Sequence, residues 1–140
     1  MTMRIISQLQ TLDQALNAWK RYQSIPAEQF SRDPDTQYMV CHAMLISIQS
    51  AIDIATGIAV MKTPKRPDTY RETFKVLGVS GFLPPELANE LSRLAGFRNI
   101  LVHEYTGLDT DRVYAILQKD WQVLDAFRKR VKEIVREQKG

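Results

Sequence analysis

Residues 36–61 restrict the fold of this 140-residue chain more than any other segment. Apolar residues recur there at helical spacing, but they cover almost every side of the helix, which predicts burial on most of its surface. The segment is long enough to suggest a membrane span, yet it carries His42, Gln49 and Asp53, which would be costly in hydrocarbon without partners. We therefore expect the buried central helix of a bundle and no membrane association.

Amphipathic helices are predicted on both sides of this segment. The first joins apolar residues spaced by three or four and ends before Pro26. Residues 31–36 have turn chemistry, with Asp35 or Thr36 as the candidate N-cap of the central helix. No segment alternates apolar and polar residues as a strand does.

Capping and turn residues divide the second half of the chain. Residues 69–72 form a capping box that opens a short helix ending at Gly78, and residues 84–85 open a longer helix that runs toward His103. Gly107 is a natural stop, and a final amphipathic helix starts at Asp109 or Thr110. The chain is thus expected to be a single all-α domain, residues 1–140, folded as an up-and-down bundle of four to five helices.

Composition adds only weak limits on function. The net charge of +3 is compatible with a polyanionic partner without requiring one. A single cysteine, Cys41, excludes an intrachain disulfide framework and fits a reducing cytoplasm. The first residues lack the apolar stretch of a signal peptide, so we expect a cytoplasmic protein.

Residues 98–105, with the sequence RNILVHEY, combine the groups that RNA cleavage without a metal requires. Such cleavage needs a base for the 2′-hydroxyl proton, an acid for the departing 5′-oxygen, and a cation for the phosphate. His103 suits both proton roles because histidine titrates near neutral pH. Arg98 suits the phosphate because its planar guanidinium donates to two oxygens and keeps its charge.

The same segment also indicates a dimer. Arg98 and Tyr105 are seven residues apart and point almost the same way on a helix, whereas His103 lies about 140° round from Arg98. One chain offers a single well-placed histidine, and the mechanism uses two proton-transfer groups. A two-fold homodimer in which Arg98 and His103 face their symmetry mates would supply both.

Simpler interpretations of the polar residues remain open. Arg98, His103 and Tyr105 could cap the carbonyl groups at a helix C-terminus. Asp53 is expected to form a salt bridge or hydrogen bond with the Arg98 region, or else to lie at an interface or in solvent. His42 is expected to be a packed or interface histidine. It lacks the second Cys/His pair of a metal site, so no metal is predicted.

Several segments beyond this motif resemble the HEPN superfamily, and most closely its HepT-like toxins. The similar segments are Asp53-Ile-Ala in the central helix and residues 70–77, 81–87, 94–105 and 108–109, the last followed by an amphipathic helix. The resemblance spans nearly the whole chain. It implies an all-α HEPN bundle that dimerises around a composite ribonuclease site, with Arg98 and His103 as the catalytic pair and Asn99 as a polar neighbour.

The resemblance also implies a mode of regulation. HepT-like toxins belong to type VII-like toxin–antitoxin pairs, in which a minimal nucleotidyltransferase antitoxin transfers AMP from ATP to the tyrosine that corresponds to Tyr105. ATP and magnesium would then be used by the partner, and this chain would need no cofactor. The expected function is a metal-independent endoribonuclease toxin. The alternative is a non-catalytic subunit that binds a nucleotide or substrate for its nucleotidyltransferase partner.

Overall fold

The computed structural model describes residues 2–63, 67–103 and 107–139. Over these ranges the chain is built of helices without a strand, as the sequence predicts. The helices are α1 (Thr2–Tyr22), α2 (Ala27–Arg32), α3 (Pro34–Lys62), α4 (Tyr70–Val79), α5 (Pro85–His103), α6 (Thr110–Lys119) and α7 (Trp121–Lys139).

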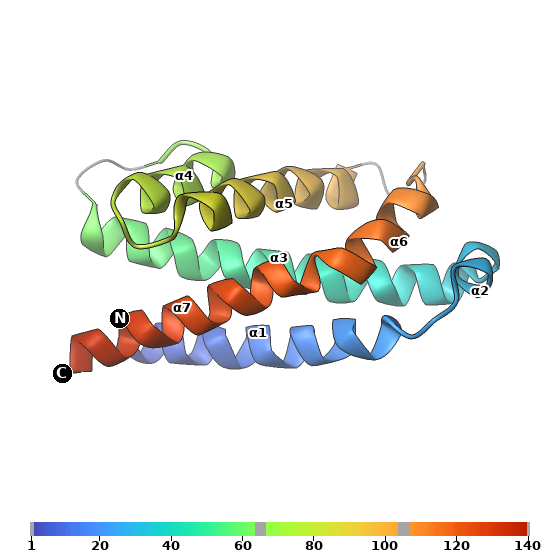
Figure 1. The fold of residues 1–140 in the computed structure, drawn as a ribbon, viewed down its shortest axis with the longest axis horizontal. Helices are drawn as coiled ribbons and strands as arrows, with labels where there is room; N and C mark the ends of the chain where they lie inside the picture. The colour runs from blue at the N-terminus through green and yellow to red at the C-terminus, as the bar shows by residue number, and fades with distance from the viewer. Residues whose placement is uncertain (1, 64–66, 104–106, 140) are drawn as a thin grey trace.

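Helix α3 is the centre of the bundle. Figure 1 shows it between α1 on one side and α4 with α5 on the other, while α7 crosses it. By length and composition α3 could cross a membrane, but 56% of its most apolar window is buried inside the molecule. It supplies much of the core, including Met44, Ile48, Ile52 and Ile58, each at most 1% exposed. The prediction of a buried central helix is therefore confirmed.

The start of α3 differs from the expectation. Asp33 is the N-cap, and neither Asp35 nor Thr36 takes that place. The Asp33 carboxylate accepts hydrogen bonds from the backbone nitrogen of Thr36 at 3.3 Å and from its hydroxyl at 2.7 Å, and these bonds lower the pKa of Asp33. The physical reason is Pro34, whose fixed φ suits the first helical position and so places the cap one residue before it.

Two further differences raise the number of helices above four or five. Residues 27–32 form the short helix α2, where buried Phe30 anchors a segment that was partly expected to be a turn. The single final helix that we expected is divided at Asp120 into α6 and α7. Asp120 accepts hydrogen bonds of 2.7 Å and 3.2 Å from Arg93 of α5, and Trp121 donates to the Leu16 carbonyl at 3.0 Å. These long-range contacts fix the break.

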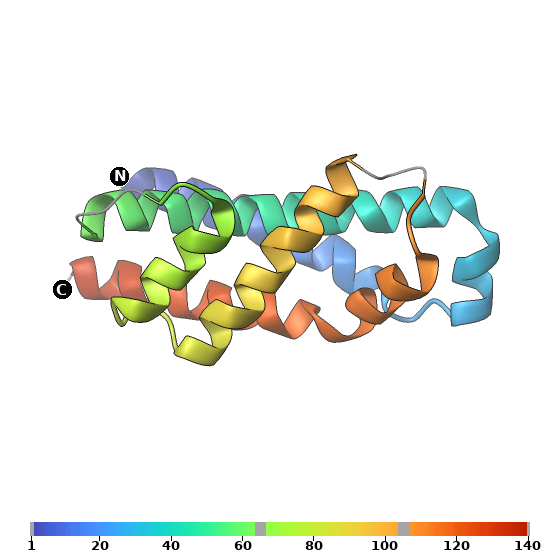
Figure 2. The ribbon, with the colours of Figure 1, turned by 90° about the horizontal axis from the view of Figure 1, so that it is seen from above.

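Helix α4 begins as predicted and lies unusually close to α5. Thr69 accepts a hydrogen bond from the Glu72 backbone nitrogen at 3.1 Å, although the Glu72 carboxylate accepts from Asp68 instead of closing the capping box on Thr69. The helix ends at Val79, one residue beyond the predicted stop at Gly78. A Cβ atom built on Gly78 would lie 2.7 Å from the Cβ of Ala88, so α4 and α5 pack backbone against backbone there. Figure 2 shows the two helices joined by a short turn at this end.

We expect Gly78→Ala to lower the free energy of unfolding by about 1–3 kcal/mol, because the added methyl group meets a rigid neighbour and separates α4 from α5. Urea denaturation monitored by circular dichroism measures the change. Gly57→Ala in α3 is the matched control: nothing lies within 4 Å of its added Cβ, so it should leave stability unchanged or raise it by up to about 1 kcal/mol. Equal stability of the Gly78 variant and wild type would contradict the close packing.

Candidate active site

Arg98 is held by side chains from three helices. It lies near the C-terminal end of α5, and its Nε donates a 2.8 Å hydrogen bond to Oε1 of Gln49 on α3. Its Nη1 donates at 3.2 Å to Oδ1 of the adjacent Asn99. The guanidinium carbon lies 5.4 Å from the ring centre of Tyr70, at the start of α4, which is the geometry of a cation–π contact. The arginine is therefore positioned without being enclosed, and its side chain remains half-buried.

No carboxylate neutralises Arg98 in the described part of the chain. The ion pairs formed by these residues do not include Arg98, and its partners Gln49 and Asn99 are uncharged. A guanidinium with neutral partners keeps its full charge for an external anion.

Asp53 reaches this site only indirectly. Its Oδ1 accepts a 2.9 Å hydrogen bond from Nε2 of Gln49, and Gln49 in turn accepts from Arg98. The expected contact with the Arg98 region is thus made through Gln49, one turn earlier on α3, which itself accepts from the guanidinium. Asp53 is exposed and orients the amide of Gln49.

His103 is exposed in the last turn of α5. It forms no hydrogen bond with another residue of the described ranges, so its ring is accessible to a substrate. Asn99, one turn earlier, is exposed as well. Tyr105, the predicted site of modification, and Glu104 lie outside the described residues.

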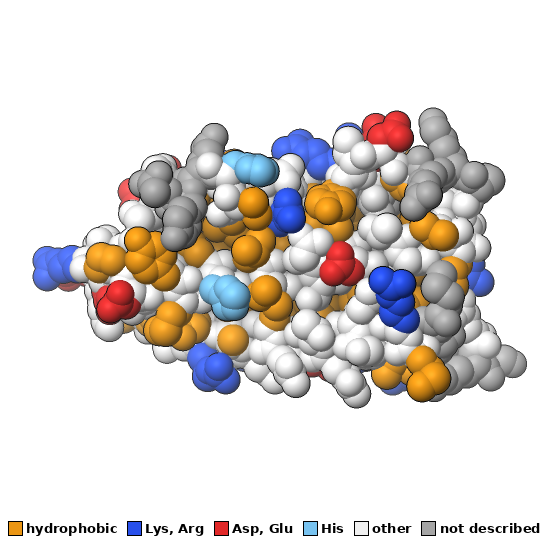
Figure 3. All heavy atoms as spheres, turned by 180° about the vertical axis from the view of Figure 1, so that it is seen from behind, with side chains coloured by type: hydrophobic (Ala, Val, Ile, Leu, Met, Phe, Trp, Pro, Cys, Tyr) orange, Lys and Arg blue, Asp and Glu red, His pale blue; other side chains and the backbone are white. Residues whose placement is uncertain are grey.

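Both histidines of the chain lie on one face of the molecule. Figure 3 shows two histidine side chains on the same face, with hydrophobic side chains gathered between them, and the chain contains only His42 and His103. His42 is exposed on α3, which fits the interface placement better than the packed one that we also considered. Within the described ranges no group of three or more His, Cys, Asp or Glu side chains could hold a metal ion.

Sequence reasoning brought Arg98, Asn99 and His103 together because they share one helix, and it missed the roles of Gln49 and Tyr70. Gln49 carried a signal: it is a large polar residue in the least polar helix, four positions before Asp53. Tyr70 is contributed by a different helix, and nothing in its local pattern indicates contact with an arginine 28 residues later.

Comparison with known proteins places this arrangement in a family. The family model described as "Ribonuclease HepT-like" matches residues 12–131. The mRNA nuclease HepT of Shewanella oneidensis is 27% identical over 125 residues, covering 88% of this chain and 92% of the relative. The tRNA nuclease HepT of Aphanizomenon flos-aquae is 29% identical over 110 residues, covering 79% of this chain and 75% of the relative.

Solved structures agree with this placement. The tri-AMPylated HEPN toxin of Shewanella oneidensis, in complex with its MNT antitoxin, is similar with a TM-score of 0.84 and 25% identity, covering 92% of this chain and 96% of the toxin. The cytosolic protein YutE of Bacillus subtilis shares the fold alone, with a TM-score of 0.82 at 18% identity, covering 97% of this chain and 91% of YutE. The helical bundle and the family match over most of the chain lead to one conclusion: this protein belongs to the HepT-like ribonuclease family.

Proposed function

We propose that this chain is a ribonuclease toxin that cleaves RNA without a metal, at a site shared by two copies of the chain. The observation that carries the proposal is the state of Arg98: a cation fixed by Gln49, Asn99 and Tyr70, free of any described carboxylate, on the same helix as an exposed histidine. Relatives that are nucleases, acting on mRNA in one case and tRNA in another, support an RNA substrate.

The chemistry follows from these side chains. Neutral His103 takes the proton of a ribose 2′-hydroxyl, and the 2′-oxygen attacks the neighbouring phosphorus. The bond from phosphorus to the 5′-oxygen breaks, and that oxygen receives a proton from the protonated histidine of the second copy. Arg98 donates to the non-bridging oxygens as negative charge builds on them. The products are a 2′,3′-cyclic phosphate and a 5′-hydroxyl.

The exposed apolar surface supports a homodimer on this face. Tyr38 and Met39 of α3 are 58% and 49% exposed, and Val102 of α5, next to His103, is 42% exposed. Large apolar side chains at this exposure gain stability when a partner covers them. A two-fold partner seated here brings a second His103 toward the first, which completes the acid–base pair.

The proposal extends to the silencing of the toxin. The AMPylated state of the similar Shewanella toxin supports transfer of AMP to Tyr105 by a nucleotidyltransferase antitoxin, which would use ATP and magnesium itself. AMP groups add negative charge and bulk close to Arg98 and His103 in the sequence, where they compete with the RNA phosphate. The pair would act in the cytoplasm, where its RNA substrates are found.

The first test is cleavage of purified cellular RNA by unmodified protein in excess chelator. Wild type should cleave, whereas Arg98→Ala and His103→Ala should lose at least about 100-fold in rate, because each removes a group that acts in the transition state. Arg32→Ala, which removes an exposed arginine paired with Glu28 on α2, is the matched control and should cleave normally. Absence of cleavage by folded, unmodified wild type would favour the non-catalytic binding subunit.

The same assay tests whether two copies share one site. In a heterodimer of one wild-type and one His103→Ala protomer, purified through two different tags, a shared site lacks either its acid or its base. Activity should therefore fall by about 100-fold or more. Retention of half the wild-type activity would show two independent sites and would contradict the shared one.

The neutrality of the Arg98 partners gives a further prediction. Gln49→Glu keeps an oxygen beside Nε but adds a carboxylate that competes with the phosphate, so the KM for RNA should rise about tenfold. Thr56→Glu is the matched control, since it adds the same charge to an exposed position of α3 about two turns away. Equal KM values for the two variants would show that Arg98 does not depend on an uncharged partner.

Replacement of the modified residue separates silencing from catalysis. Tyr105→Phe should accept no AMP from the antitoxin and ATP, as measured by intact mass, and should stay toxic when the antitoxin is co-expressed. Wild type should gain mass and lose toxicity under the same conditions. Undiminished modification of the Tyr105→Phe protein would place the acceptor at another residue.

A further inference from the structure

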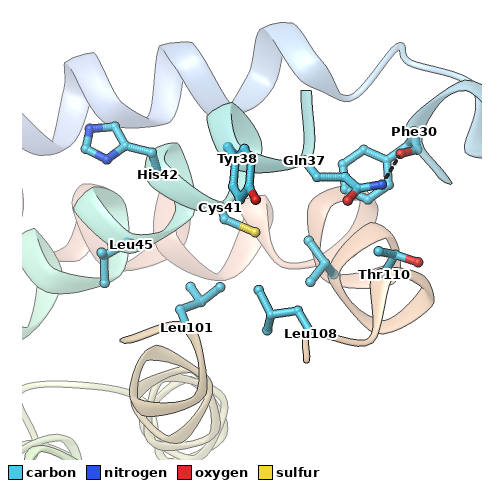
Figure 4. A pocket seen from close by; sticks show the side chains of 10 residues that line it. Phe30, Gln37, Tyr38, Cys41, His42, Leu45, Leu101, Leu108 and Thr110 are labelled. Atoms are coloured by element: carbon cyan, nitrogen blue, oxygen red, sulfur yellow. Dashed lines mark hydrogen bonds between the residues drawn. The ribbon is translucent and has the colours of Figure 1, made fainter. Parts of the chain in front are cut away.

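A pocket of about 530 Å³ is lined on α5 by Leu101, which lies three residues after Arg98 and two before His103. It lies between the N-terminal part of α3, the end of α5 and the start of α6, with Phe30 of α2 at its far wall. Figure 4 shows Tyr38 and Cys41 of α3 facing Leu101 and Leu108 across it. The volume falls in the range of small-molecule sites, roughly 300–1,000 Å³. Nothing in the chemistry proposed above uses this pocket.

The described walls of the pocket are uncharged. Among the described residues that line it, none is a lysine, arginine, aspartate or glutamate. Cys41 stays a neutral thiol at physiological pH, because burial raises its pKa to about 11. His42 lies at the rim on α3. The pocket therefore suits a neutral, largely apolar group and is unsuited to a phosphate, which Arg98 accommodates instead.

One polar group on the wall is fixed in orientation. Nε2 of Gln37 donates a 2.8 Å hydrogen bond to the Phe30 carbonyl oxygen, and only the nitrogen of the amide can donate. Its Oε1 is thereby left as an acceptor beside the pocket, as Figure 4 shows.

The pocket is lined by one leucine within residues 98–105 and by another just after them. Leu101 precedes His103 by two residues, and Leu108 follows Tyr105 by three. In a nucleotide, a single ribose joins the phosphate to the base. If the phosphate lies at Arg98 and His103, the base lies one sugar away, so a neutral pocket next to a cationic site matches the two halves of a nucleotide.

We propose that this pocket binds a nucleobase with an exocyclic amino group, which donates to Oε1 of Gln37. The inference rests on the function proposed above. The base has two available sources with the same chemistry: an RNA nucleotide beside the scissile phosphate, or the adenine of an AMP group attached to Tyr105.

Methyl NMR of the unmodified, full-length protein tests the site without relying on activity. The labelled methyl groups of Leu101, Leu108 and Val113 report on the pocket, and those of Val79, 91% exposed at the end of α4, serve as the internal control. The probes are the 3′-monophosphates of adenosine, cytidine, guanosine and uridine, with ribose 5-phosphate as the ligand without a base.

The three nucleotides that carry an exocyclic amine should shift the pocket methyl groups, and the shifts from the uridine nucleotide should be weaker. Ribose 5-phosphate should leave them unchanged. Equal shifts from ribose 5-phosphate, or no shift from any nucleotide, would overturn the proposal. A partner copy that fills the pocket would also prevent any nucleotide from shifting these methyl groups, and the proposal would be wrong in that case too. Because these spectra do not depend on cleavage, a failure of the ribonuclease function and a failure of the pocket are distinguishable.

Two variants identify the source of the base. Cys41→Phe fills the pocket, and Gln37→Met removes the acceptor with little change in volume, so one of them remains informative if the other folds poorly. A base from RNA predicts a rise in KM for RNA of at least about fivefold in both variants. Val76→Phe, which fills a separate hollow of about 320 Å³ along α4, should leave KM unchanged.

A base from the AMP group predicts a different pattern. The KM for RNA then stays at the wild-type value in Cys41→Phe and Gln37→Met, while AMPylation of Tyr105 shifts the methyl groups of Leu101, Leu108 and Val113 in wild type. If both variants keep the wild-type KM and AMPylation leaves these methyl groups unshifted, neither source occupies the pocket and the proposal is wrong.

Discussion

The burial of α3 is the constraint on which the rest of the structure depends. A helix that is apolar on nearly every side has to be covered on nearly every side, and α1, α4, α5, α6 and α7 all pack against it. One stripe is less covered: His42 and Asp53 are exposed on it, and Gln49 is half-buried. The polar residues that disfavoured a membrane span thus lie on the least covered side of α3. Because α5 packs alongside this stripe, its Arg98 meets Gln49.

The choice of partners around Arg98 has a chemical consequence. An aspartate or glutamate at position 49 would bind the guanidinium more strongly, but an incoming phosphate would then have to displace a carboxylate. An amide and an aromatic ring orient the arginine and leave its charge uncompensated. Asp53 contributes from one step further away, since it orients the amide of Gln49 without touching the guanidinium. The Asp53 carboxylate thus helps to fix the side chains of the site without neutralising the charge of Arg98.

Sequence patterns predicted the features that depend on local chemistry. The apolar periodicity of α3, the N-cap Thr69 and the start of α6 at Thr110 all follow from residues within one or two turns of each other. The missed features depend on distant contacts: the break at Asp120 on Arg93, 27 residues away, and the position of Arg98 on Gln49, 49 residues away. Helical periodicity carries no information about such pairs. The family resemblance predicts the roles of Arg98 and His103, and the structure shows how Arg98 is held.

The Arg98 site and the pocket that Leu101 lines differ in charge. Arg98 offers an uncompensated cation, whereas the pocket beside it offers uncharged walls and a single oriented acceptor. A free phosphate satisfies only the first of these and an apolar ligand only the second, so a nucleotide is the kind of molecule that satisfies both. The same reasoning connects the substrate and the silencing that we propose: an AMP group joined to Tyr105 would have the same two halves as an RNA nucleotide. Attached within residues 98–105, it would compete for the cation and the pocket as an intramolecular ligand, at an effective concentration that free RNA does not reach.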